Sequence, residues 1–210
     1  MALFGRKSGS AEPARGAARF ARHSSGWAAV VNFLRSQDAL RVLDFGPTSA
    51  GNINFITGLG HSIYMSNVVE DAARPEYRGI DESGAETFNV KRFLDENLDF
   101  QGRTFNAVTL WDTLDYLPTA LMQPLVDRLC NVMEPGGKLL AFFHSKTTGD
   151  EAQFSRYHLT AEDSLSIQRI GSQQLLHTWS NRQVETMFAG FAGNKFFLAK
   201  DSLREVIVTR

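Results

Sequence analysis

Residues 41–52, RVLDFGPTSAGN, decide the fold of this chain. The apolar run 41–45 predicts a short buried strand, which Gly46 and Pro47 end. The following residues, 52–59, predict a helix closed by Gly60, and residues 61–66 (HSIYMS) predict a second strand. A strand, a helix and a strand within about 25 residues form a β-α-β unit, which indicates a parallel sheet.

The rest of the chain continues this alternation. An apolar stripe predicts a helix over 26–36, and FNAVTLWDTL (105–114) and KLLAFF (138–143) predict buried strands on either side of a helix that starts at Pro118. The later elements are an inserted hairpin at about 154–171, a helix opened by the capping box Ser180-x-x-Gln183, and a terminal antiparallel hairpin, 195–199 with 203–209. The order predicts an α/β, doubly wound fold with a mainly parallel sheet.

Composition limits the class of protein. The chain has 210 residues, 43% of them hydrophobic, and a formal net charge of -1. No basic excess points to a nucleic-acid binder, and no apolar run reaches the roughly 18 residues of a membrane span. The single cysteine, Cys130, excludes an internal disulfide and fits a reducing compartment, so we expect a cytoplasmic protein. No His or Cys cluster has the spacing of metal ligands.

The first 24 residues differ from the remainder, 25–210. Five basic residues and one acid give this segment a net charge of +4, and its apolar residues are sparse. We expect a flexible basic arm, because such a segment cannot offset the entropy lost on ordering. The alternative is an Arg-rich targeting peptide.

Ligands of open α/β sheets bind where the carboxyl ends of the strands meet the following turns. After the first strand, Asp44, Gly46 and Gly51 surround a turn whose amides are placed to receive an anionic group at a helix end. After the second strand, Ser66 and Asn67 stand where a ribose hydroxyl is commonly held. The turn after Gly46 also fits a simple tight connection, since no G-x-G-x-x-G is present.

A third group lies around the strand at 105–114. Asp95 and Glu96 are candidates for an adenine amino group, with Trp111 beside the ring and Asp112 at the strand exit. An acidic surface loop accounts equally well for the two acids.

The succession RVLDFGPTSAGN, DENLDFQGRTFNAVTLWDTLDYLP and MEPGGKLLAFFHS resembles the class I S-adenosylmethionine-dependent methyltransferases. The terminal FFLAKDSLREVIVT is similar to the antiparallel strands that end their sheet. The resemblance covers residues 26–210 and implies a Rossmann-like sheet of seven strands, with S-adenosylmethionine as cofactor and S-adenosylhomocysteine as product. Two glycines of that family's first motif are here Thr48 and Ala50, so Thr48 would lie against the methionine part of the cofactor.

The preferred hypothesis is methyl transfer to a small-molecule acceptor. The alternative is an inactive methyltransferase-like binding or assembly module, and nucleic acid is not expected as a partner because the family's nucleotide-flipping motif is missing. A dimer is compatible with the number of phenylalanines. Candidate catalytic residues are His144 after the strand at 138–143, Asp112, and Tyr157 and His158 in the inserted hairpin. A histidine at a strand end also serves as a hydrogen-bonded structural residue.

Overall fold

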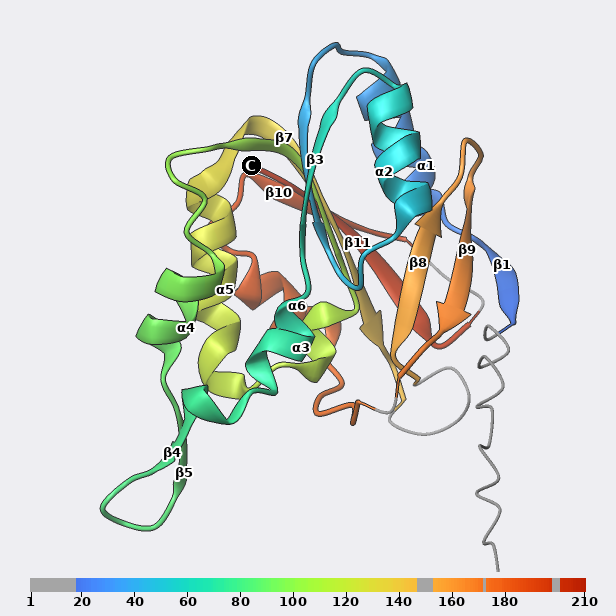
Figure 1. Cartoon of the computed structure of the whole chain (residues 1–210). Coiled ribbons are helices and arrows are strands. Elements are labelled where there is room, and N and C mark those ends of the chain that lie inside the picture. The colour runs from blue at the N-terminus through green and yellow to red at the C-terminus, as the bar shows by residue number, and fades with distance from the viewer. Residues whose placement is uncertain (1–17, 147–152, 172, 198–200) are drawn as a thin grey trace, which may run out of the picture.

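The computed structural model describes residues 18–146, 153–171, 173–197 and 201–210. A six-stranded sheet lies at the centre of the described structure (Figure 1). In spatial order its strands are β10 (Gly193–Phe197), β11 (Leu203–Thr209), β7 (Met133–His144), β6 (Phe105–Trp111), β2 (Arg41–Phe45) and β3 (Ser62–Ser66). The last four are parallel, and β11 and β10 are antiparallel, as the sequence predicts. Residues 198 and 199 of the predicted terminal hairpin lie outside the described residues.

The prediction of seven strands is wrong for the described residues. The segment between β3 and β6 does not join the sheet but forms a separate two-stranded hairpin of β4 (Arg78–Ile80) and β5 (Glu86–Phe88). This hairpin extends away from the body of the molecule (Figure 1), and five of its six strand residues are exposed. With no apolar face to bury against the sheet, the segment has little to hold it beside β3.

Helices cover both faces of the sheet and give it two separate hydrophobic cores (Figure 1). Helices α1 (Ser25–Arg35) and α2 (Ala50–Gly58) lie on one face. The other face is covered by α3 (Val68–Ala72), α4 (Val90–Asn97), α5 (Thr119–Val132) and α6 (Asn181–Met187). The described part of the chain contains no helix with the length and apolar character needed to cross a lipid bilayer.

Local sequence signals set the helix starts. Ser24 accepts a hydrogen bond from the Trp27 amide and begins α1, close to the predicted position. Ser49 caps α2 in the same way, so that helix begins at residue 50 instead of 52. The predicted capping box between Ser180 and Gln183 is confirmed at the start of α6.

A second, three-stranded sheet lies beside the first. The predicted inserted hairpin is confirmed as β8 (Ser155–Leu159) and β9 (Ser164–Arg169). The other edge of β9 pairs with β1 (Arg19–His23), so the prediction of a flexible arm through residue 24 is wrong for this strand. Residues 1–17 of the predicted arm lie outside the described residues.

Charge neutralisation explains why the basic segment orders. The Arg22 side chain is only 8% exposed and forms ion pairs with Asp201, at 2.6 Å, and with Glu205. Glu205 also accepts hydrogen bonds from Ser24 Oγ and from the Gly26 amide. The arginine is thus buried with its charge compensated, and β1 needs no apolar face because its backbone pairs with β9.

Gly26 lies at the closest approach of α1 to the sheet. A Cβ atom at this position would lie 2.5 Å from Leu140 Cδ1 and 2.9 Å from Glu205 Oε2, and its amide donates to that same carboxylate at 2.6 Å. Only a residue without a side chain fits here, which ties the start of α1 to β7 and β11.

We expect Gly26→Ala to lower the free energy of unfolding by about 1–3 kcal/mol, because the added methyl group overpacks this contact. Gly58→Ala is the matched control, since a Cβ atom there meets nothing within 4 Å. Urea denaturation of both variants measures the difference. Equal stability of the two would contradict the packing argument.

Candidate functional site

The carboxylate of Asp44 is the centre of the predicted site, and the protein itself occupies it fully. Asp44 is the last residue but one of β2, is 2% exposed, and accepts three hydrogen bonds. The donors are Thr109 Oγ1 at 2.6 Å, Trp111 Nε1 at 2.7 Å and Asn52 Nδ2 at 3.0 Å. Burial raises the pKa of Asp44, and the three donors act in the opposite direction.

Trp111 adopts an unusual backbone conformation to make its bond. It lies at the end of β6 with a φ of 50°, in the left-handed region that bulky residues avoid at a cost of about 1–3 kcal/mol. Its indole ring then stacks on the Tyr157 ring, with centroids 4.8 Å apart and planes 9° apart. The strained residue is therefore held by Asp44 on one side and by the hairpin on the other.

The hairpin β8–β9 is fastened to the first turn of α2. Asn52 donates to the Tyr157 carbonyl at 3.0 Å and accepts from the Leu159 amide at 2.9 Å. Ser49, the cap of α2, lies 2.9 Å from Nδ1 of His158. The remaining cavity, lined by Gly46, Tyr157 and their neighbours, measures about 10 Å³, close to the space that one water requires.

A buried cluster of titratable groups lies behind this cavity, at the ends of β6 and β7. Asp115 Oδ2 accepts from the His144 amide at 2.7 Å and lies 2.9 Å from His144 Nδ1. The other imidazole nitrogen, Nε2, lies 3.9 Å from Asp112 Oδ2. Asp112 Oδ2 and Asp115 Oδ1 are buried without a hydrogen-bond partner among the described residues. The structure thus brings together three of the four predicted catalytic residues, because Tyr157 also faces Asp112.

Burial dominates the protonation of this cluster. It raises the pKa of Asp112 to about 7, despite the opposing charge of His144. Burial also raises the pKa of Asp115 and places the pKa of Tyr157 well above its usual value. His158 lies outside the cluster, between Ser49 and Gln168, and burial lowers its pKa. Within the described residues, no three His, Cys, Asp or Glu side chains are arranged to hold a metal ion.

The predicted nucleotide-contacting residues lie in several different places. Gly46 lines the small cavity, whereas Thr48 and Gly51 are exposed. The carbonyl of Ser66 accepts from the Gly46 amide at 2.9 Å, and Asn67 donates to Glu70 at 2.8 Å. Asn67 Oδ1 is buried with no partner among the described residues.

Asp95 and Glu96 are not brought to the site. Both are exposed on α4, where Asp95 pairs with Lys91 at 2.6 Å and Glu96 pairs with Arg92 at 2.8 Å. Helix periodicity accounts for both pairs, because residues four apart share one helix face. Both acids therefore form ion pairs on the surface of α4 and do not reach the site around Asp44.

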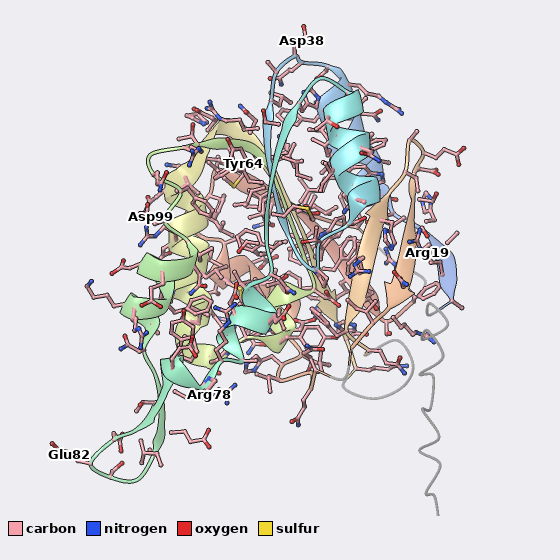
Figure 2. The ribbon with its side chains drawn as sticks, in the orientation of Figure 1. Arg19, Asp38, Tyr64, Arg78, Glu82 and Asp99 are labelled. Atoms are coloured by element: carbon pink, nitrogen blue, oxygen red, sulfur yellow. The ribbon has the colours of Figure 1, made fainter. Side chains whose placement is uncertain are left out.

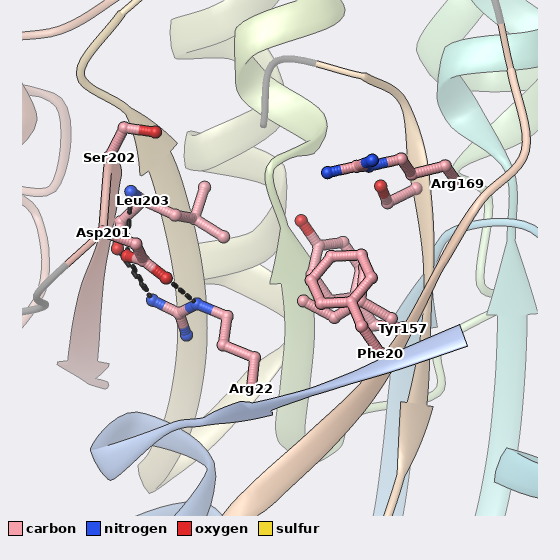
Figure 3. A pocket seen from close by; sticks show the side chains of 9 residues that line it. Phe20, Arg22, Tyr157, Arg169, Asp201, Ser202 and Leu203 are labelled. Atoms are coloured by element: carbon pink, nitrogen blue, oxygen red, sulfur yellow. Dashed lines mark hydrogen bonds and ion pairs between the residues drawn. The ribbon is translucent and has the colours of Figure 1, made fainter. Parts of the chain in front are cut away.

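Tyr157 also forms one wall of a second cavity of about 70 Å³ (Figure 3). The opposite wall holds Arg22 with Asp201, and the Arg169 guanidinium lies 5.2 Å from the centre of the Phe20 ring. Tyr157 therefore separates this cavity from the one beside Asp44.

Three residues of the site were not found from the sequence. Asn52 and Thr109 hold Asp44, and Asp115 holds His144. The sequence does indicate that these three residues make hydrogen bonds, because polar residues in otherwise apolar elements need partners. Only the fold shows which partners those are.

Comparisons with known proteins show which solved structures have a similar fold. No protein-family model and no curated protein sequence matches this chain. A S-adenosylmethionine-dependent methyltransferase from Methanosarcina mazei is similar in structure, with a TM-score of 0.52 and 14% identity over 87% of this chain and 96% of that one. Magnesium protoporphyrin IX methyltransferase from Synechocystis, solved with bound S-adenosylhomocysteine, gives a TM-score of 0.49 and 13% identity over 88% and 81% of the two chains.

A longer protein matches over part of its length. An O-methyltransferase family protein from Burkholderia thailandensis gives a TM-score of 0.43 and 14% identity over 87% of this chain. This chain spans only 55% of that protein.

We expect Asp112→Asn to raise the free energy of unfolding at pH 8 more than at pH 5. The native pKa of about 7 exceeds the usual value of 3.8, so the folded state binds the proton more tightly. The stabilising effect of that proton is complete below pH 4 and is lost as the pH rises towards 7. Asparagine, which carries no charge, should remove this loss.

Chemical denaturation of both proteins between pH 5 and pH 8 tests the expectation. A difference between them that does not change with pH would show that Asp112 does not titrate in this range.

Proposed function

We propose that this chain, which has the fold of the class I S-adenosylmethionine-dependent methyltransferases, acts as a methyltransferase-like binding and assembly module without using that cofactor. Of the two sequence-level hypotheses, the geometry favours this second one. The observation that carries the proposal is the Asp44 carboxylate, saturated by three donors from the protein itself.

The residues present do not fit the cofactor. Small-molecule sites commonly enclose about 300–1,000 Å³, whereas about 10 Å³ lies between Asp44, Gly46 and Tyr157. The start of α2 is equally closed to the anionic end of a ligand. Ser49 accepts from the Asn52 amide, and the hairpin takes both polar atoms of the Asn52 side chain.

One observation favours methyl transfer to a small molecule as a second candidate. Asn67 Oδ1 and Asp112 Oδ2 are buried acceptors without hydrogen-bond partners among the described residues, and they stand after β3 and β6. Unsatisfied buried acceptors are rare in folded proteins and often mark a ligand or a water. If the hairpin were displaced, Asp112 would be positioned to accept a proton from an oxygen or nitrogen nucleophile.

Titration calorimetry with S-adenosylhomocysteine separates the two candidates. We expect no heat of binding for the unaltered chain at millimolar ligand, because the hairpin and Trp111 occupy the cavity. We also expect none for Asn52→Ala, which removes the bonds from α2 to Asp44 and to the hairpin. Asn54→Ala, at an exposed position of the same helix, is the matched control.

Binding by either protein would contradict the expectation, and the two cases differ in what they imply. Saturable micromolar binding by the unaltered chain would overturn the proposal. Binding by Asn52→Ala alone would identify the hairpin as a lid and establish the second candidate. Circular dichroism confirms that each protein titrated is folded.

A further inference from the structure

The β3 edge of the main sheet is open. Within the described ranges, β3 pairs only with β2. The Ser62 amide donates to the Leu40 carbonyl and the Ser66 carbonyl accepts from the Gly46 amide, both at 2.9 Å, so these residues face β2. Because backbone groups alternate along a strand, the amides and carbonyls of Ile63 and Met65 point away from the sheet. Such an edge is a template for another strand.

The hairpin β4–β5 also has outer sides that pair with no other strand of the described residues. From here on "the arm" means this hairpin and not the basic segment at the N-terminus. The backbone amide of Asp81 donates to the Ala85 carbonyl at 3.0 Å, and the backbone amide of Asn89 donates to the Tyr77 carbonyl at 2.7 Å. These bonds mark the positions that face inward. The positions between them face outward. On β5 they leave two residues whose backbone groups are free for another strand, Glu86 and Phe88. On β4 they leave Ile80, because the Arg78 amide already donates to the Pro75 carbonyl.

Apart from Phe88 at its base, which packs against Phe93, the arm extends into solvent. The Ile80 side chain is 74% exposed, the highest value among the large apolar residues described. Figures 1 and 2 show the arm projecting beyond α4, with Glu82 at its tip and Arg78 near its base. A two-stranded hairpin alone is marginally stable in water, so an arm that leaves Ile80 uncovered calls for a partner.

The base of the arm prevents it from reaching the β3 edge of its own chain. Tyr77 is 2% exposed, and its ring packs at 5.0 Å from that of Phe93 on α4. Its hydroxyl donates to Glu96 at 2.9 Å and accepts from Asn97 at 2.9 Å. These contacts direct the arm away from β3. Figure 1 shows β3 near the centre of the view and the arm projecting at the lower left.

We propose that two copies of this chain exchange arms, so that the arm of each copy adds its strand β5 to the β3 edge of the other. The two outward residues of β5, Glu86 and Phe88, match the two on β3, Ile63 and Met65. The exchange is self-complementary, as a two-fold dimer requires, and uses the strand addition seen in many peptide-binding sheets.

Charge also favours a second copy as the occupant. The arm carries Asp81, Glu82 and Glu86 against Arg78, and is therefore acidic. The guanidinium of Arg103 lies 5.5 Å from the centre of the Tyr64 ring on β3. An acidic arm that approaches β3 thus meets a cation there.

Light scattering coupled to size-exclusion chromatography tests the exchange on the full chain. We expect twice the single-chain mass of 23.4 kDa at high micromolar concentration. Ile80→Asp should raise the dimer dissociation constant at least tenfold. Ile170→Asp alters an exposed isoleucine on a different strand end and should leave it unchanged. Met65→Pro, which removes an outward amide but no bond to β2, should act like Ile80→Asp.

Hydrogen exchange identifies the surface involved. The amides of Ile63 and Met65 should be protected in the concentrated unaltered protein and exposed in Ile80→Asp, whose substitution lies outside the core. A monomer at every concentration would overturn the proposal. So would a dimer that survives Ile80→Asp, or that leaves these two amides unprotected, since either result would mean another surface or another partner for the arm.

Discussion

The buried carboxylate of Asp44 organises the carboxyl side of the sheet. Its three hydrogen bonds join β2 to β6 through Thr109 and Trp111, and to α2 through Asn52. Asn52 passes the connection on to β8 by two further bonds. A buried carboxylate is costly unless it is fully hydrogen-bonded, so these elements must keep their relative positions for Asp44 to be tolerated.

The same bonds decide what the turn after β2 can do. Trp111 reaches Asp44 only by holding a φ of 50°, and its ring then supports Tyr157. The strain is local, but its consequence is that only about 10 Å³ remains open beside Asp44. Ser49 and Asn52 of the turn are bonded within the fold, and this is the basis of the proposal that the chain does not use the cofactor.

Sequence patterns predicted helices and strands well where a local interaction, within a few residues of the chain, determines the element. Apolar periodicity located α1, and the capping box located α6, because both signals act within a few residues. The order of β1 was missed because its stability comes from Asp201 and Glu205, about 180 residues away. The candidate site shows the same division. His144 and Asp112 were found at strand ends, whereas Asp115 and Asn52 depend on contacts that only the folded chain brings together.

Any ligand that binds the turn before α2 must first displace hydrogen bonds that the protein already makes there. The amide and side chain of Asn52 and the hydroxyl of Ser49 are already bonded, so a ligand and the hairpin compete for the same groups. Three hairpin bonds at about 1 kcal/mol each correspond to about a hundredfold loss of apparent affinity. The stacked Tyr157 ring adds to that barrier. The side chains of Thr48 and Ala50 in the turn are therefore the smaller obstacle to a ligand, because both are exposed to solvent, whereas the hairpin must be displaced.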